Sequence, residues 1–134
     1  MKIRTSIVCL PVRHIEKTLV FYKDALGFSE ANIDEGIILV ELPNLSLFLM
    51  DKGAFEAYSK KAGRAAHLPD DRVGLIISCA MESQEEVDSI LGVVSKYGGT
   101  AHGQAANDEA TGGYIGYFTD PDGYLWELVH STRG

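Results

Sequence analysis

The residue with the clearest chemical potential in this sequence is Glu127, which interrupts an apolar run near the end of the chain. Leu125, Trp126, Leu128 and Val129 flank it directly. An unpaired carboxylate in apolar surroundings is costly, so this one must be hydrogen-bonded, neutralised by a raised pKa, or open to water. Its natural partner is a cationic or hydrogen-bond-donating ligand, and its alternative role is that of a general base.

A β-hairpin is predicted to position this carboxylate. Two runs rich in aromatic and β-branched residues, 113–119 and 124–130, flank the sequence Asp-Pro-Asp-Gly at 120–123. Pro121 presets a φ near −65°, and Gly123 supplies the positive φ that closes a tight turn. This pattern is typical of two paired strands joined by a short turn. Glu127 would then lie in the middle of the second strand.

Length and composition indicate one folded, water-soluble domain. The chain has 134 residues, of which 46% are hydrophobic and 23% are charged, and it carries a formal net charge of −7. Nucleic-acid binding depends on clustered Lys and Arg, so the acidic balance argues against a nucleic-acid partner. No run is long enough to span a membrane, and the N-terminal apolar stretch lacks a cleavage site. We therefore expect a cytoplasmic protein with neither a nucleic-acid nor a membrane partner.

The cysteines and histidines show no metal-binding or catalytic spacing. Cys9 and Cys79 each lie inside an apolar strand-like run, which predicts free, buried thiols in a reducing compartment. The histidines are isolated from one another in the sequence, and each is interpreted as structural or solvated: His14, His67, His102 and His130. His14, at the start of a predicted helix, is expected to cap that helix or to lie on the surface.

Hydrophobic periodicity predicts the same order of elements twice. The first half reads as a strand, a helix and three strands, at 3–12, 14–26, 28–33, 37–42 and 45–50. The second half reads as a strand at 73–80, a helix at 83–97, a weak strand at 100–104 and the closing hairpin. The segment between them contains a short helical pattern followed by a loop. In this connector, Tyr58 and Arg64 are expected to cover a ligand cleft.

The repeated order predicts an α+β fold of two tandem βαβββ modules. We expect one domain over 1–134, made of a module at 1–51, a connector at 52–72 and a module at 73–134. The two modules would form a curved eight-stranded mixed sheet with both helices on its convex side. A curved sheet of this kind leaves a cleft on its concave side, where a ligand would bind.

The duplicated pattern resembles a known superfamily. The segment Pro11 to Phe28, which contains the sequence PVRHIEKTLVFYKDALGF, and the segment Phe118 to Leu128, which contains FTDPDGYLWEL, carry the resemblance. Together they are similar to the vicinal oxygen chelate superfamily, the group of glyoxalase I, bleomycin-resistance, fosfomycin-resistance and extradiol-dioxygenase proteins. The resemblance covers nearly the whole chain and implies the fold, without implying one reaction.

The resemblance also implies where a divalent metal would bind. In the metal-dependent members, the ligands are a His or Gln on the first strand, a Glu or His on the fourth, a His on the first strand of the second module and a Glu on the last strand. Glu127 matches the last position, whereas the others fall at Ile7, near Phe48 and near Ile76. One carboxylate cannot supply the three or so protein ligands that such an ion needs. We therefore predict no metal and no other cofactor.

Without a metal, the cleft is expected to bind a small organic ligand. The resemblance implies that Tyr117 faces this cleft, because the equivalent Tyr does so in the fosfomycin-resistance-like members. Strand alternation adds a mostly apolar lining, which comprises Ile7, Ser46, Phe48, Met50, Ile76 and Ser78. Trp126, next to Glu127, should face the helices.

Three functions remain open at this point. The first is a metal-free protein that binds or sequesters a small molecule, as bleomycin-resistance proteins do. The second is a glyoxalase-like or lyase-like enzyme in which Glu127 is the general base, although loss of the metal would remove several kcal/mol of transition-state stabilisation. The third is a homodimeric interaction module without a ligand. A homodimer is expected under all three, because strand edges of such sheets are commonly covered by association.

Overall fold

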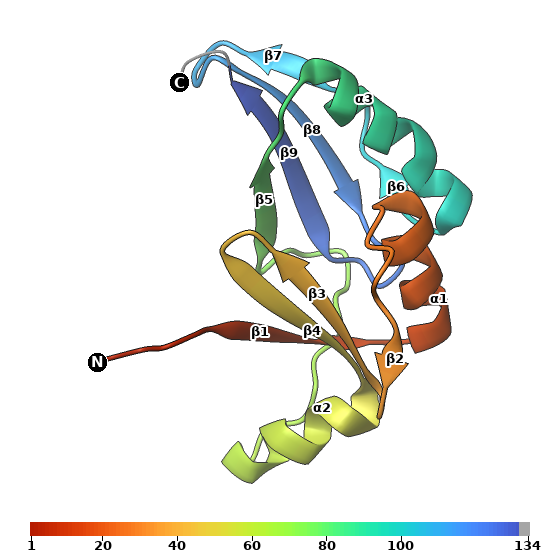
Figure 1. The fold of residues 1–134 in the computed structure, drawn as a ribbon, viewed down its shortest axis with the longest axis vertical. Helices are drawn as coiled ribbons and strands as arrows, with labels where there is room; N and C mark the ends of the chain where they lie inside the picture. Colours follow the sequence, from red (N-terminus) through yellow and green to blue (C-terminus); the bar gives the residue numbers. More distant parts are fainter. Residues whose placement is uncertain (132–134) are drawn as a thin grey trace.

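The first module contains one helix and a four-stranded sheet in the computed structural model, which describes residues 1–131 (Figure 1). Its elements are β1 (Ile7–Val12), α1 (Ile15–Val20) continued by the π-helix η1 (Phe21–Ala25), β2 (Ile33–Asp34), β3 (Ile37–Leu42) and β4 (Leu45–Asp51). The strand order is β1-β4-β3-β2, with β1 parallel to β4 and the other pairs antiparallel. Gly27, with a φ of +81°, follows the helix and turns the chain.

The connector begins with a helix that extends away from the sheets (Figure 1). α2 (Lys52–Ser59) and the short helix η2 (Lys60–Ala62) have no buried residue. Asp51 caps α2 by accepting a hydrogen bond from the backbone N–H of Ala54 at 2.8 Å. Residues 63–75 then lead to the second module without forming a strand.

The second module repeats the order and adds one short strand. Its elements are β5 (Ile76–Ala80), α3 (Gln84–Val93), the short helix η3 (Val94–Tyr97), β6 (Thr100–Ala101), β7 (Ala106–Asp108), β8 (Gly113–Thr119) and β9 (Leu125–Ser131). These strands form a five-stranded sheet in the order β5-β9-β8-β6, with β7 also pairing with β8. β5 is parallel to β9, as β1 is to β4.

These elements confirm the predicted α+β class and the duplicated order. The strands, however, form two separate sheets, of four and five strands, instead of one continuous sheet of eight. The edge strands β1 and β5 are not hydrogen-bonded to each other within residues 1–131. α1 and α3 lie on the same side of the molecule, as expected for helices on a convex face (Figure 1).

An aromatic cluster joins the helices to the closing hairpin. Phe118 on β8 and Trp126 on β9 stack with ring centroids 5.8 Å apart. Phe21 and Tyr22 of η1 pack against this pair and are both fully buried. Aromatic pairs of this kind contribute roughly 0.5–1.5 kcal/mol beyond the burial of their area. Trp126 therefore faces the helices, as its position in the strand predicted.

The turn at 120–123 is anchored inside the protein. Asp120 is 3% exposed and accepts hydrogen bonds from the backbone N–H groups of Asp122 and Tyr124, both at 2.9 Å, and from the Tyr22 hydroxyl at 2.5 Å. Asp122, also 3% exposed, accepts from the Thr18 hydroxyl at 2.7 Å. The two turn aspartates thus tie the last hairpin to the first helix of the chain.

Some local predictions differ from the structure. A strand was predicted over 28–33, but β2 begins only at Ile33. Residues 29–30 form a turn, closed by the hydrogen bond from the Ala31 N–H to the Phe28 carbonyl at 3.1 Å. Cys9 is exposed and Cys79 half-buried, so the prediction of two buried thiols was wrong. His14 holds the N-cap position of α1 without a side-chain capping bond, and is exposed. No helix among residues 1–131 is long and apolar enough to cross a bilayer.

Candidate functional site

Glu127 lies at the centre of a three-residue hydrogen-bonded group on the second sheet. Strand register places Ser78 of β5 on one side of it and Tyr117 of β8 on the other. The Ser78 hydroxyl donates to Glu127 Oε1 at 2.6 Å, and the Tyr117 hydroxyl donates to Oε2 at 2.5 Å. The sheet therefore brings together the three polar residues that the sequence predicted for a site on this module.

This group occupies the face of the sheet that points away from the helices. Trp126 and Leu128, the neighbours of Glu127 on β9, are 3% and 4% exposed and belong to the core. Side chains alternate along a strand, so Glu127 points to the opposite, open face. Its side chain is half-buried there, and Ser78 is exposed. The carboxylate is thus both hydrogen-bonded and open to water.

The Glu127 carboxylate sets the charge of the site, because the hydroxyl groups that donate to it are neutral. Hydrogen bonding to Glu127 is the main cause that raises the pKa of Tyr117, followed by burial and by the nearby negative charge. The phenol therefore remains a neutral donor across the neutral pH range. The site presents a carboxylate oriented by two hydroxyl groups, which suits a positively charged or donor group of a ligand.

The first sheet carries the equivalent positions without the equivalent chemistry. Cys9 pairs with Phe48 across β1 and β4 as Ser78 pairs with Glu127 across β5 and β9. Both Cys9 and Ser78 lie five residues before the N-cap of their module's helix, His14 or Ser83. The register therefore places Cys9 and Ser78, each two residues after Ile7 or Ile76, directly opposite Phe48 and Glu127.

These positions do not supply a divalent-metal site. Phe48 has no metal-binding atom and Ser78 offers only a neutral hydroxyl. Cys9 and Glu127 then make at most two ligands, fewer than a divalent ion needs. No group of three or more His, Cys, Asp or Glu side chains that could hold an ion occurs in the described part of the chain. The residues present thus do not fit the ion that the resemblance implies.

The other predicted lining residues lie on or beside the open faces of the two sheets. Ile7 is 44% exposed and pairs with Ser46, and Phe48 follows Ser46 by two residues on the same face. Ile76, on the second sheet, is 52% exposed. Met50 is only 1% exposed, so it is a packing residue and not an accessible wall. No hydrogen-bonded strand pair among residues 1–131 joins the sheet of Ile7, Ser46 and Phe48 to that of Glu127.

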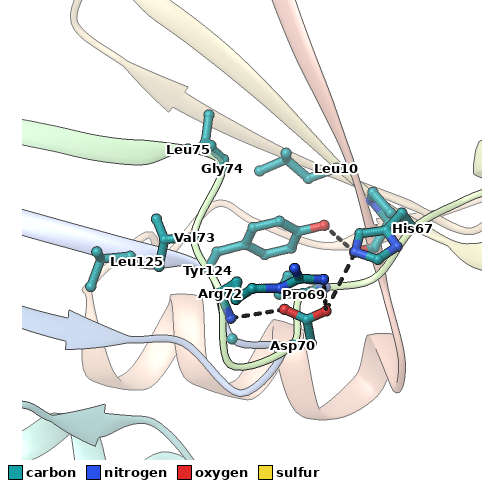
Figure 2. Close-up of a pocket in the computed structure, with 12 residues that line it drawn as sticks. Leu10, His67, Pro69, Asp70, Arg72, Val73, Gly74, Leu75, Tyr124 and Leu125 are labelled. Atoms are coloured by element: carbon teal, nitrogen blue, oxygen red, sulfur yellow. Dashed lines mark hydrogen bonds and ion pairs between the residues drawn. The ribbon is translucent and has the colours of Figure 1, made fainter.

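A pocket of about 530 Å³ lies where the connector crosses between the modules (Figure 2). Apolar side chains from both modules line it, among them Leu10, Val73, Leu75, Tyr124 and Leu125. Among its lining residues, Asp70 lies 3.7 Å from the His67 imidazole and 4.0 Å from the Arg72 guanidinium. Leu125 precedes Glu127 by two residues on β9, so the two side chains share one face of the strand.

Sequence reasoning did not identify this pocket. Tyr58 and Arg64, which were expected to cover the cleft, do not line it, and Tyr58 is 62% exposed on α2. The connector lines it instead with residues near its end, which are His67, Pro69, Asp70 and Arg72, and the apolar Val73 and Leu75 follow just after the connector. Val73 and Leu75 fall inside the strand predicted at 73–80, whereas β5 begins at Ile76, and both are exposed.

Arg13 holds the connector in place beside this pocket. Its guanidinium donates to the Pro69 carbonyl at 2.5 Å and to the Asp122 carbonyl at 2.6 Å. Its backbone N–H donates to the Asp122 carboxylate at 2.6 Å. One residue thus links the first module, the connector and the closing turn, and it holds the backbone at Pro69, which lines the pocket.

Comparison with protein families gives one match that spans most of the chain. The sequence model described as "Glyoxalase/Bleomycin resistance protein/Dioxygenase superfamily" matches residues 4–128. No curated protein sequence matches this chain.

Solved structures of similar fold cover almost the entire chain. A hypothetical protein, SA1046 from S. aureus, superposes with a TM-score of 0.78 at 24% identity, and covers 97% of this chain and 95% of its own. A glyoxalase-related enzyme from Fulvimarina pelagi gives 0.78 at 21% identity, with 96% and 88% covered. A glyoxalase/bleomycin resistance protein/dioxygenase from Nocardioides gives 0.75 at 20% identity, with 100% and 87% covered. At these identities, the likeness concerns the fold alone.

Proposed function

Because the chain belongs to the glyoxalase/bleomycin resistance protein/dioxygenase superfamily, we propose that its open sheet face binds a small organic molecule without a metal ion. The observation that carries the proposal is the carboxylate of Glu127, held by Ser78 and Tyr117 on an otherwise largely apolar face. Charge-assisted hydrogen bonds are about twice as strong as neutral ones. A ligand with an ammonium or another strong donor group is therefore favoured over an anion.

The apolar part of the ligand would lie toward Leu125. Residues two apart on a strand are separated by roughly 7 Å, which is within the length of a small aromatic amine. Leu125 lies between the Glu127 group and the pocket of Figure 2, and the exposed Ile76 pairs with it across the sheet. A ligand with a cationic head and an apolar body of this length would contact both regions.

We propose that a second copy of the chain completes the site. β1 and β5 each end a sheet, and both carry exposed isoleucines, Ile7 at 44% and Ile76 at 52%. Free strand edges with apolar side chains are commonly covered by association. Light scattering after gel filtration should give twice the chain mass, and Ile76→Asp should shift it toward the monomer. A monomer for the wild type at all concentrations would contradict this part of the proposal.

The two free cysteines fit a reducing compartment, and we place the protein in the cytoplasm on that basis. Cys9 is exposed on β1, where oxidising surroundings would favour its modification or cross-linking. Fractionation of cells that produce the protein, followed by immunoblotting, tests this location.

An enzymatic role for Glu127 has weaker support than binding. Glyoxalase-type proton abstraction relies on a metal ion to stabilise the enediolate oxygens, and the described residues around Glu127 do not fit such an ion. Turnover of methylglyoxal and glutathione that disappears in Glu127→Gln would favour the enzyme instead. A ligand-free interaction module is the reading that remains if no small molecule binds.

A matched set of probes tests the binding proposal. Phenethylamine, phenethyl alcohol and phenylacetate share one apolar body and differ in charge. The amine should raise the melting temperature of the wild type most, and Glu127→Gln should remove this preference. Glu41→Gln, which changes an exposed carboxylate on β3 of the other sheet, is the control and should behave as the wild type. Equal effects of all three probes, or an unchanged preference in Glu127→Gln, would contradict the proposal.

A further inference from the structure

A second cavity, of about 570 Å³, lies on the helical side of the molecule. Residues along α1 and the two positions before it, at 13–20, form one wall. Residues 96–98, at the end of η3, form another, and Pro121 also lines it. η1 and η3 pack against each other beside it. Trp126 faces the helices while Glu127 faces away from them, so this cavity and the Glu127 group lie on opposite sides of the second sheet.

Three basic side chains from different segments line the cavity: Arg13, Lys17 and Lys96. They are three of only twelve basic residues in a chain with nineteen acidic ones. Within residues 1–131, none of the three forms an ion pair. Their positive charge is therefore concentrated at one place on an acidic protein and is not neutralised there by a direct ion pair.

Arg13 is the fixed member of this group. Its guanidinium donates to two backbone carbonyls, those of Asp122 and Pro69, at 2.6 and 2.5 Å. These bonds hold the planar group in position while leaving its charge unpaired, and three of its five N–H donors remain for another acceptor. A planar guanidinium with free donors is well suited to a phosphate or carboxylate group.

The carboxylates near the cavity do not compete strongly for these cations. Asp122 is 3% exposed, and its two oxygens accept hydrogen bonds from the Arg13 backbone and the Thr18 hydroxyl. Glu16 lines the cavity from an exposed helix position and forms no ion pair with a described residue. An anion of higher charge density than one carboxylate would therefore be preferred.

The remaining wall is apolar. Val20 is 47% exposed although it is a large aliphatic residue, and Tyr97 and Pro121 lie around the same cavity. Covering this surface would add a hydrophobic contribution to an electrostatic one. The cavity thus combines a cationic region with a patch that suits a ring or a short hydrocarbon group.

We propose that this cavity binds a phosphate monoester carried on a small apolar or aromatic group. The dianionic phosphate would lie among Arg13, Lys17 and Lys96, and the organic group would lie against Val20 and Tyr97. The proposal is independent of ligand binding at Glu127, because the two sites share no residue.

Titration of the full chain with phenyl phosphate, followed by backbone amide NMR, tests the site. Saturable shifts should appear in residues 13–20 and 96–98, with no comparable shifts at Tyr117 or Glu127. Inorganic phosphate should bind several-fold more weakly, because it lacks the ring. Lys17→Gln and Lys96→Gln should each weaken phenyl phosphate by roughly threefold to tenfold, as expected for partly exposed charge pairs.

Lys23→Gln is the matched control, because Lys23 is exposed on the same helical segment but does not line the cavity. It should bind phenyl phosphate as the wild type does. Absence of saturable shifts at millimolar phenyl phosphate would overturn the proposal. So would equal affinity for inorganic phosphate, equal weakening in Lys23→Gln, or shifts confined to the Glu127 face.

Discussion

Replacing Tyr22 by phenylalanine removes one hydroxyl group that serves two buried partners. This hydroxyl donates to the Asp120 carboxylate at 2.5 Å and accepts from the Trp126 indole N–H at 3.2 Å. Tyr22 is fully buried, Asp120 is 3% exposed and Trp126 is also 3% exposed. Water therefore cannot easily replace the lost hydroxyl at either partner.

The expected loss of stability is about 2–4 kcal/mol. A buried group left without its hydrogen-bond partner costs about 1–3 kcal/mol, and more when the group is charged. The bond to Asp120 should dominate, since the 3.2 Å contact to Trp126 is the longer of the two. For a chain of this size, such a change lowers the melting temperature by roughly 6–15 °C.

The loss should also depend on pH in a defined direction. Burial raises the pKa of Asp120 to about 6, and the hydrogen bond from Tyr22 acts against this rise. Without the hydroxyl, the pKa of Asp120 in the folded state rises further. Because a raised folded-state pKa makes stability fall as the pH increases, Tyr22→Phe should lose more stability at about pH 8 than at about pH 5.

Urea unfolding at these two pH values measures both effects. Trp126 is the one tryptophan of the chain and lies in the affected network, so its fluorescence reports on unfolding. Tyr58→Phe is the matched control, because Tyr58 is 62% exposed, and it should change the free energy of unfolding by less than about 0.5 kcal/mol. A loss in Tyr22→Phe that equals that of Tyr58→Phe, or a larger loss at the lower pH, would refute the reasoning.

Three further predictions concern Asp120, Tyr117 and the metal. The raised pKa of Asp120 contributes stability that is fully present below its unfolded-state pKa and is lost as the pH rises through about 6. Asp120→Asn should therefore reduce the change of the unfolding free energy over this pH range by roughly 2–3 kcal/mol. An unchanged pH dependence would contradict this. Glu127→Gln should lower the pKa of Tyr117, measured by NMR titration of the tyrosine ring carbons, because the bond to Glu127 raises it; an unchanged pKa would show that the bond is absent in solution. Treatment with EDTA should leave the melting temperature and the amine response unchanged; stoichiometric zinc, nickel, iron or manganese liganded through Glu127 would contradict the metal-free proposal.

Local chemistry explains why the closing hairpin was predictable. Pro121 and Gly123 specify the turn by their own backbone preferences, and Gly123 has a φ of +99° in the structure. The alternation around Trp126 and Glu127 correctly assigned one to the core and the other to the open face. The strand register places Ser78 beside Glu127. The family resemblance had instead implied that the metal-ligand position on this strand falls near Ile76.

Long-range contacts explain what the sequence did not reveal. Asp120 and Asp122 read as turn residues, yet their partners Tyr22, Thr18 and Arg13 lie about a hundred residues earlier in the chain. β7 was missed because its three residues, at 106–108, carry no apolar alternation. The pocket beside Leu125 depends on how the connector crosses β1, which no local pattern specifies.

Calorimetric titration of the wild type and of Glu127→Gln with phenethylamine tests the central claim most directly. The wild type should bind the amine saturably, and Glu127→Gln should bind it roughly tenfold to a hundredfold more weakly, because a charge-assisted hydrogen bond would be lost. Equal affinity in the two proteins, or no saturable binding to the wild type, would contradict the account.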